Sequence, residues 1–263
     1  MFTEPRPSRS DVVSVVDDIP EYERQSTSMR DRRSILAPRF ARQIQLTVAP
    51  WLSKSWEQCD VVDVGCGYGH TAAALSQEVR SVIGIEPSES LALAAQEHGK
   101  AHGVRVVHGG HEQLLHYREH FDLAVMDNVF EHIPNQAEAL ANVAAALRPG
   151  GVLYLLVPNR TWPIEAHYGL PFLSWLPLPL ANRYLRLSGR GEDYTDASYA
   201  PSCRSLQRFF ANQERLEAHF VLPGDVSLAQ GSSPLYRAGV VALKHIPALW
   251  HVSKALLVVA KRV

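Results

Sequence analysis

The sequence predicts an α/β fold in which helices cover both faces of a doubly wound, mostly parallel sheet. The first observation is a run of β-branched residues, Val61, Val62 and Val64, which leads directly into closely spaced glycines, as a buried strand does when it turns into a helix. The second is that further apolar runs, at 81–86, 104–107 and 121–126, alternate with segments of helical pattern. Alternation at this spacing is typical of βαβ units, whose strands run parallel.

Composition limits the classes of protein to which the chain can belong. Its 263 residues, 46% of them hydrophobic, can bury one large core, so we expect one domain. The net charge of −1 offers no basic surplus, and we expect no nucleic-acid partner. The three cysteines, Cys59, Cys66 and Cys203, have no metal-ligand spacing. Without a signal peptide or a run of ~18 apolar residues, the pattern favours a cytoplasmic protein, with membrane-surface attachment left open.

Two regions are expected along the chain. Residues 1–55 form an N-terminal extension, in which 1–21 lack a sustained period and 29–52 carry apolar residues at helical intervals. We expect one or two helices there, which pack on the sheet or cover a ligand. Residues 56–263 form the main domain, interrupted by an insertion over 161–199.

The segment CDVVDVGCGYGH, residues 59–70, is the centre of the predicted site. Its glycines, at 65, 67 and 69, allow main chain to approach a ligand closely at the first strand-to-helix turn. A dinucleotide fingerprint would place the third glycine one residue later, where His70 stands. Glu86 ends the next apolar run, at a spacing from Asp63 that suits a carboxylate accepting two ribose hydroxyls.

Together with FDLAVMDNVFEHIP (121–134) and LRPGGVLYLLVPN (147–159), this segment resembles the class I S-adenosylmethionine-dependent methyltransferases, and within them the ubiquinone-biosynthesis-type or type 11 and 12 group. The resemblance covers 60–159. It implies a Rossmann-like sheet of seven strands, the last antiparallel beside the fifth. It implies S-adenosyl-L-methionine as cofactor, with Asp63 near its ammonium group. The cofactor-binding residues are then Asp63, Gly65, Cys66, Gly67, Gly69, Glu86, Pro87, His111, Asp127 and Asn128.

One position departs from the family pattern. Gly110 stands where these enzymes usually have an acid that accepts from the adenine amino group. Adenine recognition is therefore left to main chain, to His111 or to Glu112.

The end of the fourth predicted strand carries the candidate catalytic residues. Asn128, Glu131 and His132 would share one face of a helical turn. The segment is similar to the E-x-x-E-H segment of ubiquinone-biosynthesis O-methyltransferases and of some RNA-terminal ribose methyltransferases, which can bind a divalent metal. Three interpretations stay open: Mg²⁺ on these three residues, a metal-free His132 base, and a structural Glu-His cap. Asn128 in place of an acid weakens the metal case, because hard cations prefer carboxylates.

Residues 161–199 combine clustered prolines with aromatic side chains and show no sheet period. A long insertion after the fifth strand is expected to cover the substrate as a lid. A dimer interface and a membrane-surface helix, the latter suggested by Arg183, Arg186 and Arg190 beside apolar residues, are the alternatives. The candidate substrate-binding residues are Trp162, Glu165, His167, Tyr168 and Tyr194, and the candidate catalytic residues are His132, Glu131 and His167.

The remainder of the chain predicts a helix at 202–212, a strand near 218–226, a helix over 234–250 and a final strand at 253–261. The reaction implied by the resemblance is O-methylation of a small polar molecule. A sugar or oligosaccharide is preferred, because PNRTWPIEAHYGLPF (158–172) has a weaker resemblance to bacterial glycan O-methyltransferases. The alternatives are a prenylated phenol of quinone biosynthesis and a non-catalytic, cofactor-binding assembly partner.

Overall fold

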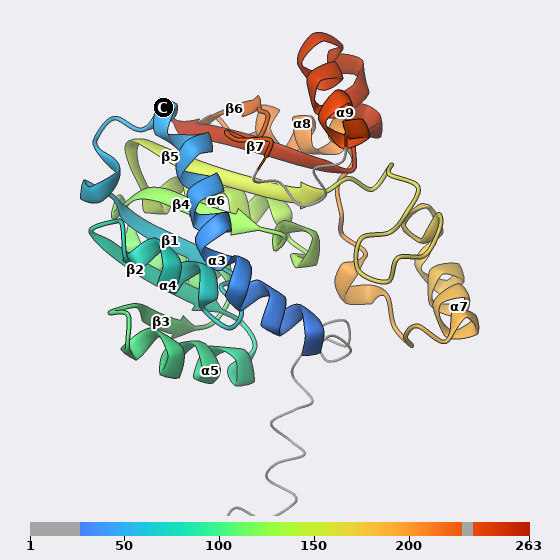
Figure 1. Ribbon diagram of the computed structural model, residues 1–263, viewed down its shortest axis with the longest axis horizontal. Coiled ribbons are helices and arrows are strands. Elements are labelled where there is room, and N and C mark those ends of the chain that lie inside the picture. Colours follow the sequence, from blue (N-terminus) through green and yellow to red (C-terminus); the bar gives the residue numbers. More distant parts are fainter. Residues whose placement is uncertain (1–26, 228–233) are drawn as a thin grey trace, which may run out of the picture.

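A computed structural model describes residues 27–227 and 234–263, and these residues form one seven-stranded sheet in the order β3-β2-β1-β4-β5-β7-β6 (Figure 1). The strands are β1 (Asp60–Val64), β2 (Ser81–Glu86), β3 (Arg105–His108), β4 (Phe121–Asp127), β5 (Leu147–Pro158), β6 (Leu216–Phe220) and β7 (Ala255–Arg262). All neighbouring pairs from β3 to β5 are parallel, and β7 lies antiparallel between β5 and β6. The predicted fold class is confirmed, including the antiparallel last strand. The predicted irregularity of residues 1–21 lies outside the described residues.

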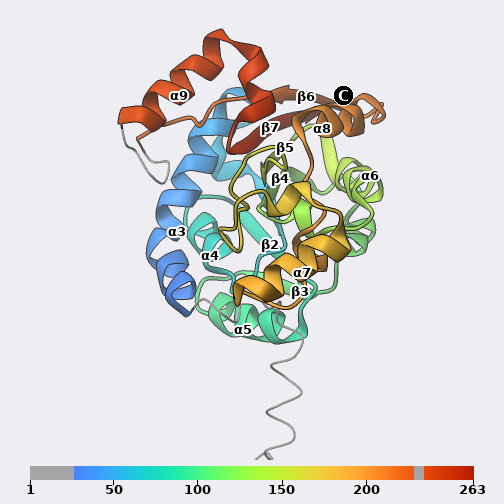
Figure 2. The same ribbon diagram turned by 90° about the vertical axis from the view of Figure 1, so that its right-hand side faces the viewer.

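Helices cover both faces of the sheet. The α-helices of the described residues are α3 (Thr27–Val48), α4 (His70–Ser76), α5 (Glu89–Lys100), α6 (Gln136–Ala146), α7 (Leu178–Ser188), α8 (Cys203–Ala211) and α9 (Pro234–His245). Figure 2 shows α3 and α4 on one side of the sheet and α6 and α8 on the other. No helix of residues 27–227 and 234–263 combines the length and the apolar character that crossing a membrane requires.

Alternation along the strands builds two cores, one on each face. Val61 packs with Ile44 of α3 and Leu75 of α4, whereas its neighbour Val62 packs with Leu140 of α6 on the opposite face. Successive side chains of a strand point to opposite faces, so a strand covered on both sides is apolar throughout. This is why the buried strands read as continuous apolar runs rather than as alternating ones.

An ionic network joins the amino ends of the central strands. The carboxylate of Asp60 at the start of β1 accepts hydrogen bonds from Arg80 and Arg148, and Asp122 of β4 accepts from Arg148 and pairs with Lys54. These charges hold the strands in register at one edge. The opposite edge, where the parallel strands end, is the one at which open α/β sheets bind ligands.

The fifth strand has an irregular start. It begins at Leu147, so the segment 148–151, whose proline and two glycines are typical of a turn, lies within the strand. Its pairing with β4 shifts register between Phe121 and Leu123, and Gly150 has a φ of 78°. The residues that read as a turn therefore form an irregular start of the strand.

The insertion has a small core of its own. It contains α7 and two 3-10 helices, Leu173–Trp175 and Thr195–Ala197, and its apolar cluster includes Leu173, Leu185 and Tyr194. Its ends meet, because the Arg160 amide donates to the Pro201 carbonyl at 3.1 Å. Figure 1 shows the insertion beyond the carboxyl ends of β4 and β5.

Candidate functional site

The glycine loop lies between β1 and α4 in a conformation that other residues rarely adopt. Gly65, Gly67 and Gly69 have φ values of 71°, 55° and 77°. A Cβ on Gly65 would lie 2.6 Å from the Val129 side chain, whereas a Cβ on Gly67 would have no atom of the described residues within 4 Å. The loop thus packs against the β4 end on one side and leaves the main chain at Gly67 open to a ligand on the other.

Three carboxylates lie around this loop, at the ends of three adjacent strands. Asp63 of β1 and Glu86 of β2 are buried, and Asp127 ends β4. Burial, followed by the charges of Asp127 and Glu86, raises the pKa of Asp63 to about 8. Burial also raises the pKa of Asp127 to about 6, against the opposing effects of Arg33 and Asn128. The acids around the loop therefore resist further negative charge.

This charge distribution decides which cofactor fits. A pyrophosphate would add negative charge beside Asp63, Glu86 and Asp127. A ligand with an ammonium group, a sulfonium and ribose hydroxyls would instead bring positive charge and further hydrogen-bond donors to these carboxylates. The residues present therefore fit S-adenosyl-L-methionine and do not fit a dinucleotide.

Glu86 also connects the second strand to the glycine loop. Its Oε2 accepts from the Gly67 amide at 2.8 Å and its Oε1 accepts from the Ser88 amide at 3.0 Å. Cys66, predicted beside the cofactor, packs its sulfur over Gly84, and its amide donates to the Ile85 carbonyl. Because its sulfur packs over Gly84, Cys66 can contact a ligand through its main chain.

The residues predicted near adenine lie after β2 and β3. The Pro87 carbonyl is 3.1 Å from His108 Nε2. His111 begins a 3-10 helix, His111–Tyr117, and its Nδ1 lies 2.9 Å from Asn142 Nδ2 of α6. Glu112 accepts from the Gly110 amide at 2.7 Å. These contacts do not test adenine recognition by His111, which stays a prediction.

The turn after β4 is not the predicted α-helical turn. Asn128 has a φ of 56° and donates to Asp127 Oδ1 at 2.7 Å, and a 3-10 helix begins only at Phe130 and ends at His132. Asn128 is exposed, whereas Glu131 is fully buried. The expectation that Asn128, Glu131 and His132 share one helical face is therefore wrong, because the left-handed residue turns the chain before the helix starts.

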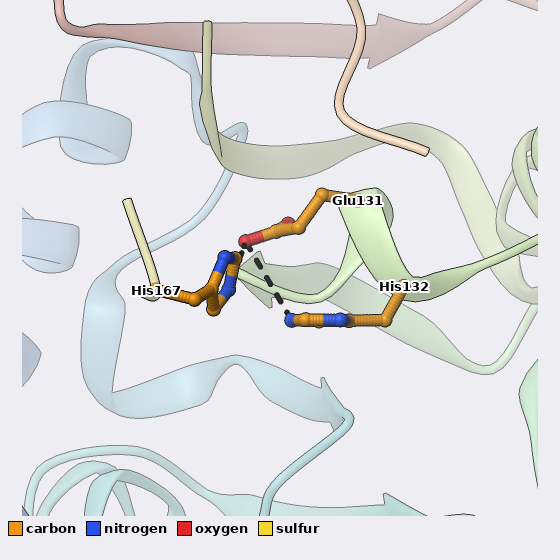
Figure 3. A group of neighbouring side chains, drawn as sticks. All are labelled: Glu131, His132 and His167. Carbon is orange, nitrogen blue, oxygen red and sulfur yellow. Dashed lines mark ion pairs between the residues drawn. The ribbon is translucent and has the colours of Figure 1, made fainter. Parts of the chain in front are cut away.

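His167 from the insertion takes the place that Asn128 was expected to fill (Figure 3). Nε2 of His167 lies 3.8 Å, and Nε2 of His132 3.9 Å, from Oε1 of Glu131. The candidate ligand atoms of the three residues lie within 4.8 Å of one another, and among the described residues they are the group that could hold a metal ion. Within residues 27–227 and 234–263, neither oxygen of Glu131 has a hydrogen-bond partner. We call Glu131, His132 and His167 the Glu-His-His cluster.

Both imidazoles are held through their other nitrogen. His132 Nδ1 lies 2.6 Å from the Asp196 carbonyl oxygen, and His167 Nδ1 lies 2.8 Å from Glu165 Oε1. Because each of these oxygens only accepts, Nδ1 carries the proton and Nε2 of a neutral ring is the acceptor. Both acceptor nitrogens therefore face Glu131.

Burial sets the charge of the cluster. It raises the pKa of Glu131 to about 7, against the opposing effect of His167, and it lowers the pKa of His132 to about 4, with His167 adding to the decrease. His132 is thus neutral at neutral pH, while Glu131 titrates near it. The cluster can accept a proton from a hydroxyl or hold a cation.

Two of the residues predicted to bind substrate lie elsewhere. Tyr168 and Tyr194 are 7% and 3% exposed in the insertion's core, and their hydroxyls donate to the Asp193 carbonyl and to Ser174. Both rings thus pack in the insertion's core, and their binding of a substrate stays a prediction. Trp162 is half-buried at the start of the insertion.

Glu165, which was also predicted to bind substrate, and a separate hollow are the remaining features of this region. Glu165, expected to orient a substrate hydroxyl, instead faces His167. A hollow of about 590 Å³ lies on the β7 side of the insertion and includes none of the predicted site residues. Its lining consists of Arg160, Thr161, Trp175, Ser202, His251 and Val252. Sequence reasoning missed the Asp196 carbonyl, which no side-chain pattern could indicate.

Comparison with known proteins identifies the family of the chain. Residues 22–209 match the family model described as a methyltransferase domain. The chain is similar to the ubiquinone biosynthesis O-methyltransferase of Rhizobium rhizogenes, at 33% identity over 133 residues that cover 49% of this chain and 54% of the relative. The corresponding enzyme of Bradyrhizobium diazoefficiens is 33% identical over 124 residues, 44% of this chain and 48% of that enzyme. The chain spans about half the length of the curated relatives it matches.

Solved structures share the fold at low identity. The plantazolicin methyltransferase BpumL, in complex with a monoazolic desmethylPZN analog and SAH, superposes with a TM-score of 0.57 at 14% identity, over 97% of this chain and 98% of that one. An S-adenosylmethionine-dependent methyltransferase from Archaeoglobus fulgidus gives a TM-score of 0.56 at 15% identity, over 92% and 100% of the two chains.

Proposed function

The chain belongs to the methyltransferase domain family, as a class I S-adenosylmethionine-dependent member, and on that premise we propose that it methylates a hydroxyl group of a small molecule. The observation that carries the choice of a hydroxyl is the Glu-His-His cluster. It places a buried carboxylate, which no described residue hydrogen-bonds, between two imidazole acceptors, directly after the strand that ends in Asp127. A weakly acidic hydroxyl needs such a proton acceptor as it attacks.

The carboxylates around the glycine loop support the cofactor part of the proposal. Glu86 would accept from the ribose hydroxyls and Asp63 would face the ammonium group, with the open main chain at Gly67 between them. When bound, S-adenosyl-L-methionine supplies a methyl group on a positively charged sulfur. Loss of that methyl would leave a neutral thioether. The positive charge is therefore present before methyl transfer, when it lies near the acids of the site.

The residues of the cluster then handle the proton. As the substrate oxygen forms its bond to the methyl carbon, its proton passes to the cluster, where Glu131 is the best-matched acceptor because burial raises its pKa to about 7. The Nε2 atoms of His132 and His167 face Oε1 of Glu131, so either could then accept a hydrogen bond from the protonated carboxyl group. Sequence reasoning favoured His132 as the base, but its lowered pKa suits an acceptor of hydrogen bonds better than a base.

A cation site at the same three residues is the second candidate. Metal centres use such a donor set and such outer partners: two imidazoles held at Nδ1, and a carboxylate whose oxygens have no hydrogen-bond partner in the described part of the chain. The imidazoles suit an ion such as Zn²⁺ better than the Mg²⁺ expected from sequence, which prefers oxygen ligands. Such an ion would lower the pKa of a bound hydroxyl.

For the substrate, we propose a phenol with an apolar tail. The relatives named above support it, and so do the exposed apolar side chains of the insertion. These are Phe172, Trp175, Leu180 and Leu187, which are 50%, 52%, 53% and 78% exposed. A saccharide, which the sequence favoured, was expected to stack on aromatic rings of the insertion. Two of these rings, Tyr168 and Tyr194, lie in the insertion's core. Lid, dimer interface and membrane contact all remain proposals for this apolar surface.

A substrate screen tests the proposed function. Purified protein would be incubated with S-adenosylmethionine and either polyprenyl phenols or partly methylated oligosaccharides, and products scored by mass gain. Methylation of a phenolic oxygen is expected. Methylation of saccharides alone would overturn the phenol, and methylation of carbon or nitrogen would overturn O-methyl transfer.

A further inference from the structure

Glu165 is an acid buried within the insertion, at 4% exposure, and both of its oxygens are engaged. Oε1 lies 2.8 Å from His167 Nδ1, and Oε2 accepts from the amides of His167 and Tyr168 at 2.8 and 2.6 Å. Burying a carboxylate is costly unless hydrogen bonds satisfy it. These three contacts arise within one turn of chain, so the turn holds the carboxylate in a fixed direction, toward the imidazole.

The consequence for His167 follows from hydrogen-bond chemistry. A carboxylate accepts but does not donate, so Nδ1 carries the proton and Nε2 of the neutral ring becomes the acceptor. That Nε2 atom faces Glu131 Oε1 at 3.8 Å. His132 is held in the same way by the Asp196 carbonyl. Both orienting oxygens belong to the insertion, whereas Glu131 and His132 belong to the turn after β4.

We propose that Glu165 is a positioning residue: it fixes the Nδ1–H tautomer of His167 and thereby directs Nε2 of His167 toward Glu131 and the reacting hydroxyl. The proposal rests on the proposed function, since it assigns the orientation of one member of the same cluster. Glu165 itself touches neither cofactor nor substrate in this role. Partners that orient a functional imidazole typically change affinity or activity by about 10- to 100-fold when removed.

The substitution Glu165→Gln is a sharp test because of the second oxygen. The position of Oε2 must accept two main-chain N–H groups, so the glutamine oxygen is drawn there and its NH₂ group faces Nδ1. A donor facing Nδ1 favours the reversed tautomer, in which Nε2 carries the proton. Glu165→Asp keeps the charge and both acceptors, so it should retain the original tautomer.

The experiment is long-range ¹H–¹⁵N NMR of the histidine rings in the full chain, combined with steady-state kinetics. In Glu165→Gln we expect His167 to change from the Nδ1–H to the Nε2–H form and kcat to fall about 10- to 100-fold, while S-adenosylmethionine affinity stays unchanged. Glu165→Asp should lie nearer to the wild type in both measurements. Glu192→Gln, the same change at an exposed acid of the insertion, should alter neither.

Two internal readouts keep the test decisive. His132, held by the insertion through the Asp196 carbonyl, should keep its own tautomer in Glu165→Gln, which shows that the insertion is still docked. An unchanged His167 tautomer, or a reversed tautomer with unchanged kcat, would overturn the proposal. The NMR measurement needs no substrate, so failure of the proposed function would be seen separately, as a wild-type protein without turnover.

Discussion

Nε2 of His167 lies 3.8 Å from Oε1 of Glu131, so the insertion after the fifth strand reaches back to the turn after the fourth. This relationship joins the segment expected to select the substrate to the carboxylate best placed to take its proton. It also means that the chemistry and the insertion are not independent, because the insertion supplies His167 and the oxygens that orient both imidazoles.

Replacing Glu86 by alanine should weaken S-adenosylmethionine binding about tenfold or more, because hydrogen bonds to a charged group contribute roughly 1.5 to 3 kcal/mol. The variant also loses the acceptor of the Gly67 amide. Titration calorimetry measures the change. Glu89→Ala, an exposed acid in the first turn of α5, is the matched control and should bind as the wild type does. Equal binding of NAD, or undiminished binding by Glu86→Ala, would refute the cofactor assignment.

Asp63→Asn should stabilise the cofactor-free protein at neutral and mildly alkaline pH. The pKa of Asp63 is raised from its usual 3.8 to about 8 by burial, so the folded state loses stability as pH rises from about 4 to about 8. An amide removes that loss. Thermal unfolding from pH 4 to 9 should therefore show a gain in the midpoint temperature that grows with pH and levels off above about 8.

Asp60→Asn is the comparison of opposite sign. Burial of Asp60 favours its neutral form, but hydrogen bonds from Arg80, Ser81 and Arg148 outweigh burial and lower the pKa. That stability is present above the unfolded pKa and is lost as pH falls, so this variant should be destabilised at neutral pH. A gain from Asp63→Asn that did not depend on pH would contradict the electrostatic account.

Excising the insertion should abolish turnover and leave S-adenosylmethionine binding nearly intact. Residues 161–199 can be replaced by a short glycine-serine linker because the Arg160 amide and the Pro201 carbonyl are already hydrogen-bonded. The shortened protein lacks His167 and both orienting oxygens but keeps the glycine loop. Calorimetry and a turnover assay test it together, and turnover at the wild-type rate would exclude the insertion from the reaction.

Exhaustive chelation distinguishes the two uses of the Glu-His-His cluster. For the cation site, removing metal should lower turnover, Zn²⁺ should restore it, and S-adenosylmethionine affinity should not change, because the glycine loop is separate from the cluster. Metal analysis of the protein before and after treatment is the control. Full turnover by metal-free protein would contradict the cation site and favour Glu131 as the proton acceptor.

The parts of the molecule that sequence predicted well are those set by local pattern. Val61, Val62 and Val64 are β-branched residues, and they are buried in a strand, as their types predict. The glycines at 65, 67 and 69 have positive φ, a conformation that other residues rarely adopt. The sheet and the glycine loop therefore followed from short segments.

What could not be predicted depends on packing between distant segments. The left-handed conformation of Asn128 shifts the start of the following helix. Asparagine adopts this conformation more readily than most residues, but its type alone does not fix where the helix begins. Tyr168 and Tyr194 were expected at a surface because aromatic rings in a proline-rich loop can serve either a ligand or a core, and only the packed insertion shows that they serve its core. The approach of His167 to Glu131 depends on how that same core folds.

The most direct test of the central claim is the Glu131→Gln variant, measured for S-adenosylmethionine affinity and for methyl transfer to a phenol by mass spectrometry. The amide keeps the shape of the buried side chain and removes both its charge and its ability to take a proton. The account predicts cofactor binding equal to that of the wild type and a loss of kcat of about 10² to 10⁴. A variant that methylates the hydroxyl at the wild-type rate would contradict it.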